Sequence, residues 1–154
     1  MSSGLINNDI INSAFITACE NNRVDIAKLL LEYKADINTN NNLALVLACQ
    51  KGYLKIVELL IQNGANIYAN DNRLFRRTYC SCHIVIMKLL LENGAANHSD
   101  INLAYQYAIE KINFVMILLL LKYGADISIK NNELRELILK HDTEIVTSIR
   151  EYID

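Results

Sequence analysis

The chain has 154 residues, of which 52% are hydrophobic and 21% are charged, and its formal net charge is -2. This composition is typical of an ordered chain and excludes an intrinsically disordered one. Because the charges nearly cancel, they also exclude a global attraction to nucleic acid or to an anionic membrane, so any such binding needs a local patch.

A period of thirty residues organises the chain. An apolar segment that ends in Asn-Gly-Ala or a close variant recurs at 54–67, 84–96 and 114–127, with a looser copy at 24–37. A repeat of this size predicts stacked supersecondary units that share one core. We therefore divide the chain into the stump of an earlier repeat at 1-11 and five rows at 12-41, 42-71, 72-101, 102-131 and 132-154.

Each row opens with an asparagine that precedes an apolar run. Asparagine in this place is typical of a helix N-cap, whose side-chain oxygen accepts a hydrogen bond from the first turn. In the second row this predicts a first helix over roughly 43–50 and a second helix over roughly 54–62. We assign the capping role to Asn12, Asn42, Asn72, Asn102 and Asn132.

The second helix of each row is expected to end at glycine, which accepts the left-handed C′ conformation without a steric clash. Lys34 occupies this position in the first row. In the loop between the two helices, Cys82 stands where the second row has Gly52. The glycines assigned to the C′ position are Gly64, Gly94 and Gly124.

Three motifs resemble the ankyrin repeat: ACQKG at 48–52, LKIVELLI at 54–61, and GANI at 64–67, which returns as GADI at 124–127. The resemblance covers nearly the whole chain, although the period is thirty residues where that family usually has about 33. It implies an all-α ankyrin-repeat solenoid of stacked helix-turn-helix units with short turns, forming a single domain over 1-154. It also implies non-catalytic protein–protein recognition through a concave groove lined by the first helices.

The repeat is a variant of the family pattern. The Thr-Pro-Leu-His opening of that family is absent, and the shorter period predicts a reduced β-turn finger that contributes less to binding. The chain has no Pro and no Trp, and it is rich in Ile, Asn, Lys and Tyr, as expected from an AT-rich genome. Such Asn-rich repeats are similar to those of amoeba-infecting giant viruses, which implies an adaptor that acts on host proteins in the host cytoplasm.

The first helices bear the residues to which we assign partner binding. Arg73, Arg76 and Arg77 stand on one side of one helix turn, and no other row has arginines there. Arginine and tyrosine are frequent interface anchors. The candidate set is Val46, Leu47, Gln50, Lys51, Arg73, Arg76, Arg77, Gln106, Tyr107 and Glu110.

Three interpretations of the arginine cluster remain open. It is a basic centre for an acidic segment of an unknown partner protein, solvated charge paired with Glu110 or Asp71, or a weak nucleic-acid site. The last is the least favoured, because three charges without interleaved stacking aromatics make a weak nucleic-acid signal. We therefore expect a protein partner and no nucleic acid.

On the outer side of the second helices, Val115 and Leu118 replace the charged residues of the first two rows. Either the last unit covers these side chains, or they form an exposed apolar patch on the convex side. The patch would suit a structural, self-associating protein. We otherwise expect a monomer, with a weak homodimer as the alternative.

The sequence points to no catalytic or metal chemistry. The segment 80–83 (Cys-Ser-Cys-His) has zinc-ligand residue types, but structural zinc usually needs four ligands and no second pair follows. No Gly-rich phosphate loop, HExxH or GxSxG is present, so we predict neither catalytic residues nor a cofactor.

Four cysteines without a secretory leader predict a cytoplasmic protein. The longest apolar run, around 116–121, is too short for a membrane span, which needs about 20 residues.

Overall fold

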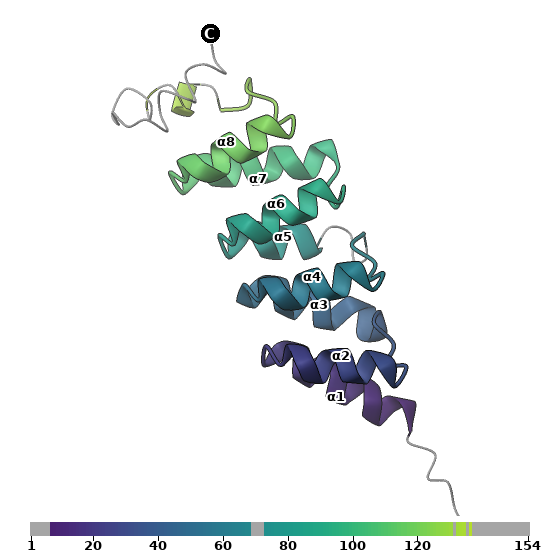
Figure 1. Ribbon diagram of the computed structural model, residues 1–154. Coiled ribbons are helices and arrows are strands. Elements are labelled where there is room, and N and C mark those ends of the chain that lie inside the picture. Colours follow the sequence, from purple (N-terminus) through teal and green to yellow (C-terminus); the bar gives the residue numbers. More distant parts are fainter. Residues whose placement is uncertain (1–6, 69–72, 131, 135, 137–154) are drawn as a thin grey trace, which may run out of the picture. The chain divides into compact units, whose positions relative to one another are not determined.

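The computed structural model describes residues 7–68, 73–130, 132–134 and 136. Figure 1 shows helices that follow one another in pairs joined by short loops. The described residues contain no β-strand, and the all-α class is confirmed. The helices are α1 (Asn8–Glu20), α2 (Val24–Glu32), α3 (Thr39–Lys51), α4 (Leu54–Gln62), α5 (Arg73–Cys80), α6 (Ile84–Glu92), α7 (His98–Glu110) and α8 (Phe114–Lys122).

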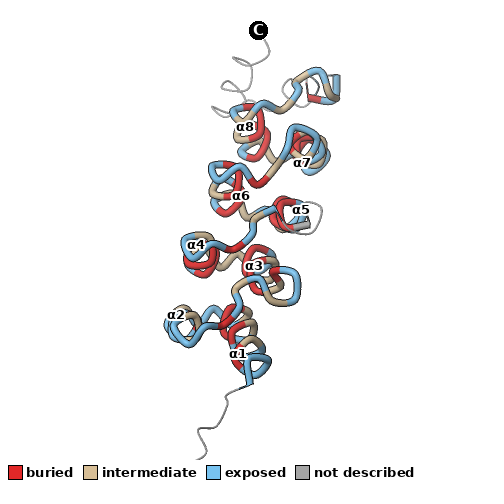
Figure 2. The backbone as a smooth tube through the Cα atoms, turned by 90° about the vertical axis from the view of Figure 1, so that its right-hand side faces the viewer, coloured by how far each residue is buried: buried red, intermediate tan, exposed pale blue. Residues whose placement is uncertain are grey.

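The chain divides into two compact units, Met1–Ile86 and Met87–Asp154. In the first unit α1 packs against α2 and α3, and α3 packs in turn against α4 and α5. Because α2 also packs against α4, the first helices of these rows form one layer and the second helices form another (Figure 2). In the second unit α7 packs against α8. The helix-turn-helix pairs of the first unit are therefore stacked as the sequence predicts.

One column of large side chains fills the core of the first unit. Phe15, Leu45 and Phe75 lie thirty residues apart, and each is 0% exposed. Tyr105 occupies the same repeat position in the second unit and is also 0% exposed. Burying such a side chain contributes about 1.5–3 kcal/mol, and the rows supply these side chains in turn, so the core is collective.

The capping role predicted for Asn12 is wrong. α1 begins four residues before it, and Asn7 is the N-cap, with its side-chain oxygen accepting a hydrogen bond from the amide of Asp9 at 3.0 Å. Asn12 lies inside the helix, and its Oδ1 accepts a hydrogen bond from the amide of Asp36 at 2.7 Å. The asparagine therefore ties the first helix to the turn that follows the second helix of the same row.

Asn102 repeats this correction in the second unit. α7 is capped by Asn97, which forms a capping box with Asp100. Asn102 lies one turn into the helix, and its Oδ1 accepts a hydrogen bond from the amide of Asp126 at 2.8 Å. Asn12 and Asn102 belong to the column of asparagines that recurs every thirty residues, which we call the asparagine column. In both rows the asparagine bonds a helix to a turn and does not cap a helix.

Asn42 makes the same kind of tie with a different geometry. It is buried, its φ is 60°, and its Nδ2 donates a hydrogen bond to the carbonyl of Asn66. The amide of Asn66 is bound instead by Asn38 Oδ1 at 2.9 Å. Of the other predicted caps, Asn72 lies outside the described residues, and Asn132 is an exposed helical residue.

The predicted C′ positions are confirmed. Gly64, Gly94 and Gly124 have φ values of 85°, 74° and 89°, and Lys34 has a φ of 66°. Each follows directly on the C-terminal turn of a second helix, where a left-handed residue reverses the chain. The interhelical loops contain a second left-handed column, consisting of Asn22, Gly52, Cys82 and Ile112.

Candidate functional site

α3 and α5 pack together in the first unit and hold most of the residues assigned to partner binding. On α3, Val46 and Leu47 are half-buried, and Gln50 is exposed near the end of the helix. On α5, Arg76 and Arg77 are both exposed. Arg73 is the first residue of α5, and its side chain lies outside the described residues.

Gln50 connects the two helices. Its Oε1 accepts a hydrogen bond from Arg77 Nη1 at 3.1 Å, and its backbone carbonyl lies 3.1 Å from His83 Nε2. Because a carbonyl oxygen only accepts, the His83 ring donates through Nε2. The end of α3 is therefore held both to α5 and to the loop that follows α5, and the guanidinium of Arg77 is oriented by this contact.

Gly52 allows the close approach between this loop and α3. Its φ is 77°, and a Cβ atom placed on it would lie 2.5 Å from Cε1 of the His83 ring. A side chain at this position would therefore meet both backbone strain and a steric clash. The sequence marked His83 only as part of a possible zinc segment. Its contact with Gln50 was not predicted, because Arg23, Tyr53 and Asn113 hold its position in other rows and share no chemistry with it.

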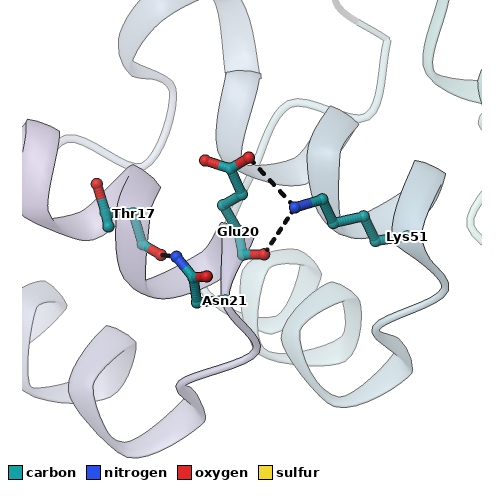
Figure 3. Close-up of polar contacts among 4 residues, drawn as sticks. All are labelled: Thr17, Glu20, Asn21 and Lys51. Atoms are coloured by element: carbon teal, nitrogen blue, oxygen red, sulfur yellow. Dashed lines mark hydrogen bonds and ion pairs between the residues drawn. The ribbon is translucent and has the colours of Figure 1, made fainter.

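Lys51 is occupied by a contact within the first unit (Figure 3). Its Nζ lies 3.2 Å from Glu20 Oε1 and donates to the Glu20 carbonyl at 3.2 Å. Both side chains are partly exposed, so the pair contributes little stability. It does offset the charge of Lys51, and it links the ends of α1 and α3. Glu20 was outside the predicted set, although its opposite charge one row earlier was a usable sequence signal.

Arg76 and Arg77 carry the remaining positive charge of this surface. No carboxylate among the described residues lies within ion-pair distance of either one. Of the two carboxylates considered as partners of the arginines, Asp71 lies outside the described residues. The other, Glu110, pairs with Lys130 at 3.0 Å.

In the second unit, the predicted residues lie along α7. Gln106 and Tyr107 are half-buried, and Lys111 Nζ lies 5.6 Å from the centroid of the Tyr107 ring. Hydrogen bonds from Lys130 to Glu110 and to a second carboxylate raise the pKa of Lys130 above its ordinary value. Glu110 is therefore bound within its own unit.

The two apolar residues predicted for the outer side of α8 differ in exposure. Val115 is 48% exposed, whereas Leu118 is half-buried. Their neighbours Met116 and Ile117 are fully buried. The side chain that reaches solvent is therefore mainly that of Val115.

The cysteines fall into two classes. Cys80 and Cys82 are exposed, and Cys82 has the left-handed φ of 57° that glycine has in the second row. Cys19 and Cys49 are buried, and burial raises the pKa of each thiol to about 12.

In the part of the chain that the structure describes, no three His, Cys, Asp or Glu side chains meet as metal ligands would. Within the same part, no helix has the length and apolarity needed to cross a membrane.

Residues 4–71 match the family model described as Ankyrin repeats (3 copies). The matched segment contains α1 to α4, the helices that stack as two pairs in the first unit. No curated protein matches the chain.

Proposed function

Residues 4–71 are ankyrin repeats, and from this premise we propose that the chain binds an acidic segment of a partner protein along its first helices. Ankyrin repeats generally serve as protein–protein interaction modules, and the family is typically non-catalytic. The observation that carries the proposal is the exposed pair Arg76 and Arg77, which has no carboxylate partner among the described residues.

The contacts around the arginines favour an anionic protein ligand. An arginine guanidinium can bind a carboxylate through two parallel hydrogen bonds, and Gln50 already orients that of Arg77. Lys51 contributes less, because Glu20 offsets its charge. A helical surface that is ordered before binding loses little conformational freedom when a partner docks.

The other residues of the candidate set are assigned to the same partner. Val46 and Leu47 supply apolar contact beside the arginine pair, and Arg73 adds charge. Gln106, Tyr107 and Glu110, on α7 of the second unit, are proposed as a separate set of contacts to that partner. The proposed setting is the host cytoplasm, where the chain would act as a viral adaptor on host proteins.

A peptide selection tests this proposal without knowledge of the partner. The intact chain is used to select binders from a displayed library of random peptides, and the selected sequences should be enriched in Asp and Glu. Replacing Arg76→Glu together with Arg77→Glu should weaken binding of a selected acidic peptide at least about tenfold, because both charges reverse. The thermal unfolding midpoint should fall only slightly, since both side chains are exposed and the described contact that is lost is the Arg77 hydrogen bond to Gln50.

The matched control reverses two other charges. Lys28 and Lys55 are exposed on α2 and α4, in the other helix layer, so Lys28→Glu with Lys55→Glu should leave peptide affinity nearly unchanged. Peptides without acidic enrichment, or equal affinity for the arginine variant, would contradict the proposal. Tighter binding of a single-stranded oligonucleotide than of the acidic peptides, with a steep salt dependence, would favour nucleic acid instead.

A further inference from the structure

The first helix pair of the first unit has an apolar face on α1 and α2. Ile10, Ile26, Leu29 and Tyr33 are 64%, 50%, 50% and 60% exposed, and Ala14 is exposed between them. Ile26 and Leu29 on α2 and its C-cap residue Tyr33 follow helical spacing, so they form one stripe. In Figure 2, α2 is coloured mostly as exposed. We call these five residues the end face.

The next repeat shows how the same positions are used when another helix pair packs on them. One period later, the counterparts of Ala14, Ile26 and Leu29 are Ala44, Ile56 and Leu59, which are 0%, 0% and 8% exposed. The first row packs against the second row, and the second row packs against the third. Among the described residues, the second row also has a row before it, the first, whereas the first row has none. For Ala14, Ile26 and Leu29 the difference in exposure indicates contact with a preceding helix pair, whereas Asn40 and Asn63, the counterparts of Ile10 and Tyr33, stay exposed.

The charges beside the end face make it self-complementary. Asp9, at the start of α1, and Arg23, just after its end, line the same open hollow of about 730 Å³ as Ile10, Ala14 and Ile26. Neither charge forms an ion pair with any other described residue. At 1.5 Å per residue, α1 spans about 16 Å from Asp9 to its end at Glu20, and the amide of Arg23 donates to the Ala18 carbonyl in its last turn, so the two charges lie near opposite ends of α1.

We propose that the end face binds a second copy of this chain across a two-fold axis. Rotation about an axis through the middle of the hollow sets α1 of one copy antiparallel to α1 of the other. Asp9 of each copy then lies opposite Arg23 of its partner, while the apolar side chains of the end face bury one another. Opposite charges at the rim fix this orientation, and apolar burial supplies most of the affinity.

Sedimentation equilibrium of the full chain between about 1 µM and 1 mM tests the dimer, because affinities in this range are typical of small interfaces. We expect a monomer–dimer equilibrium. Ile26→Glu should raise the dissociation constant at least about tenfold, since it places a charge in the apolar centre. The control Val85→Glu changes an equally exposed valine on α6, 62% exposed, and should leave the dissociation constant unchanged.

A charge exchange tests the two-fold orientation. Asp9→Arg alone sets like charges opposite each other, and so does Arg23→Asp alone, so each variant should dimerise more weakly than the original chain. An equimolar mixture of the two single variants should form a heterodimer with restored affinity, because opposite charges then face each other at both ends. Both positions are exposed, so the variants should fold, and circular dichroism checks this.

Three results would overturn the proposal. The first is a strict monomer over the whole concentration range. The second is a dimer that Ile26→Glu leaves intact and Val115→Glu abolishes, since that dimer would use the outer side of α8. The third is a mixture of the two charge variants that associates no better than either variant alone, because no two-fold pairing of the charges would then exist.

Discussion

Each of the four interhelical loops places one residue in the left-handed conformation, but the four residues differ in how well they tolerate it. Gly52 has no Cβ and adopts a φ of 77° without strain, and asparagine is the next best residue. Cys82 and Ile112 adopt φ values of 57° and 54° although their side chains disfavour them. A β-branched residue is the least suited of all, so the loop of Ile112 holds the most backbone strain.

Glycine at position 112 should relieve that strain. Ile112 is 47% exposed, so removing its side chain costs little apolar burial. Ile112→Gly should be more stable than Ile112→Ala by about 1 kcal/mol, because alanine keeps the Cβ atom that clashes in the left-handed region. Urea unfolding of both variants measures the difference. Equal stabilities would mean that the backbone at this position is not left-handed.

At the scale of the helices, the asparagine column joins the two helices of a row. Asn12 and Asn102 each bind a backbone amide that lies twenty-four residues further along the chain. The bound residues Asp36 and Asp126 in turn accept hydrogen bonds from the amides two residues after them, at 2.9 Å each. The turn after the second helix is therefore ordered from both sides.

Removing one of these ties should loosen the turn. Asn102→Ala should lower the free energy of unfolding by about 1 kcal/mol and speed hydrogen exchange of the Asp126 amide, which loses its acceptor. Ser99→Ala, at an exposed position in the first turn of α7, should change stability by less than about 0.5 kcal/mol. Faster exchange in the first turn of α7, with Asp126 unchanged, would instead support the N-cap role that the structure contradicts.

At the scale of the whole molecule, burial keeps three acidic groups among the described residues neutral. Burial raises the pKa of Cys19 and of Cys49 to about 12, from 9.0 for an ordinary thiol, and that of Tyr105 to about 12 from 10.0. The hydroxyl of Tyr105 has no hydrogen-bond partner among the described residues. Phe15 and Phe75 hold the same repeat position with no hydroxyl at all, so phenylalanine fits this site.

These groups predict loss of stability in alkali. A raised pKa in the folded state means that the unfolded chain loses its protons first, so stability is complete below about pH 9 and falls as pH rises toward 12. Urea unfolding with reductant at a series of pH values measures the fall. Tyr105→Phe should remove the part of this loss of unfolding free energy that comes from Tyr105, which begins near pH 10. The substitution should not lower stability at pH 7. A free energy of unfolding that stays constant up to pH 12 would contradict the prediction.

The sequence by itself determined the features that depend on local backbone preference and on periodicity. The thirty-residue column of apolar side chains predicted the stacked helix pairs, and Gly64 and Lys34 predicted left-handed C′ positions that the structure confirms. Both signals are local, because a residue's steric limits and its place on a helix face do not depend on distant contacts.

Only the tertiary structure decided which distant groups meet. An asparagine before an apolar run is equally compatible with a cap and with a bond to a remote turn, so the role of Asn12 was not readable from its neighbours. The contact of Gln50 with Arg77 and His83, and the pairing of Lys51 with Glu20, likewise join residues about one repeat apart. Such contacts depend on how neighbouring rows pack, which fixes side-chain positions that the repeat pattern alone leaves open.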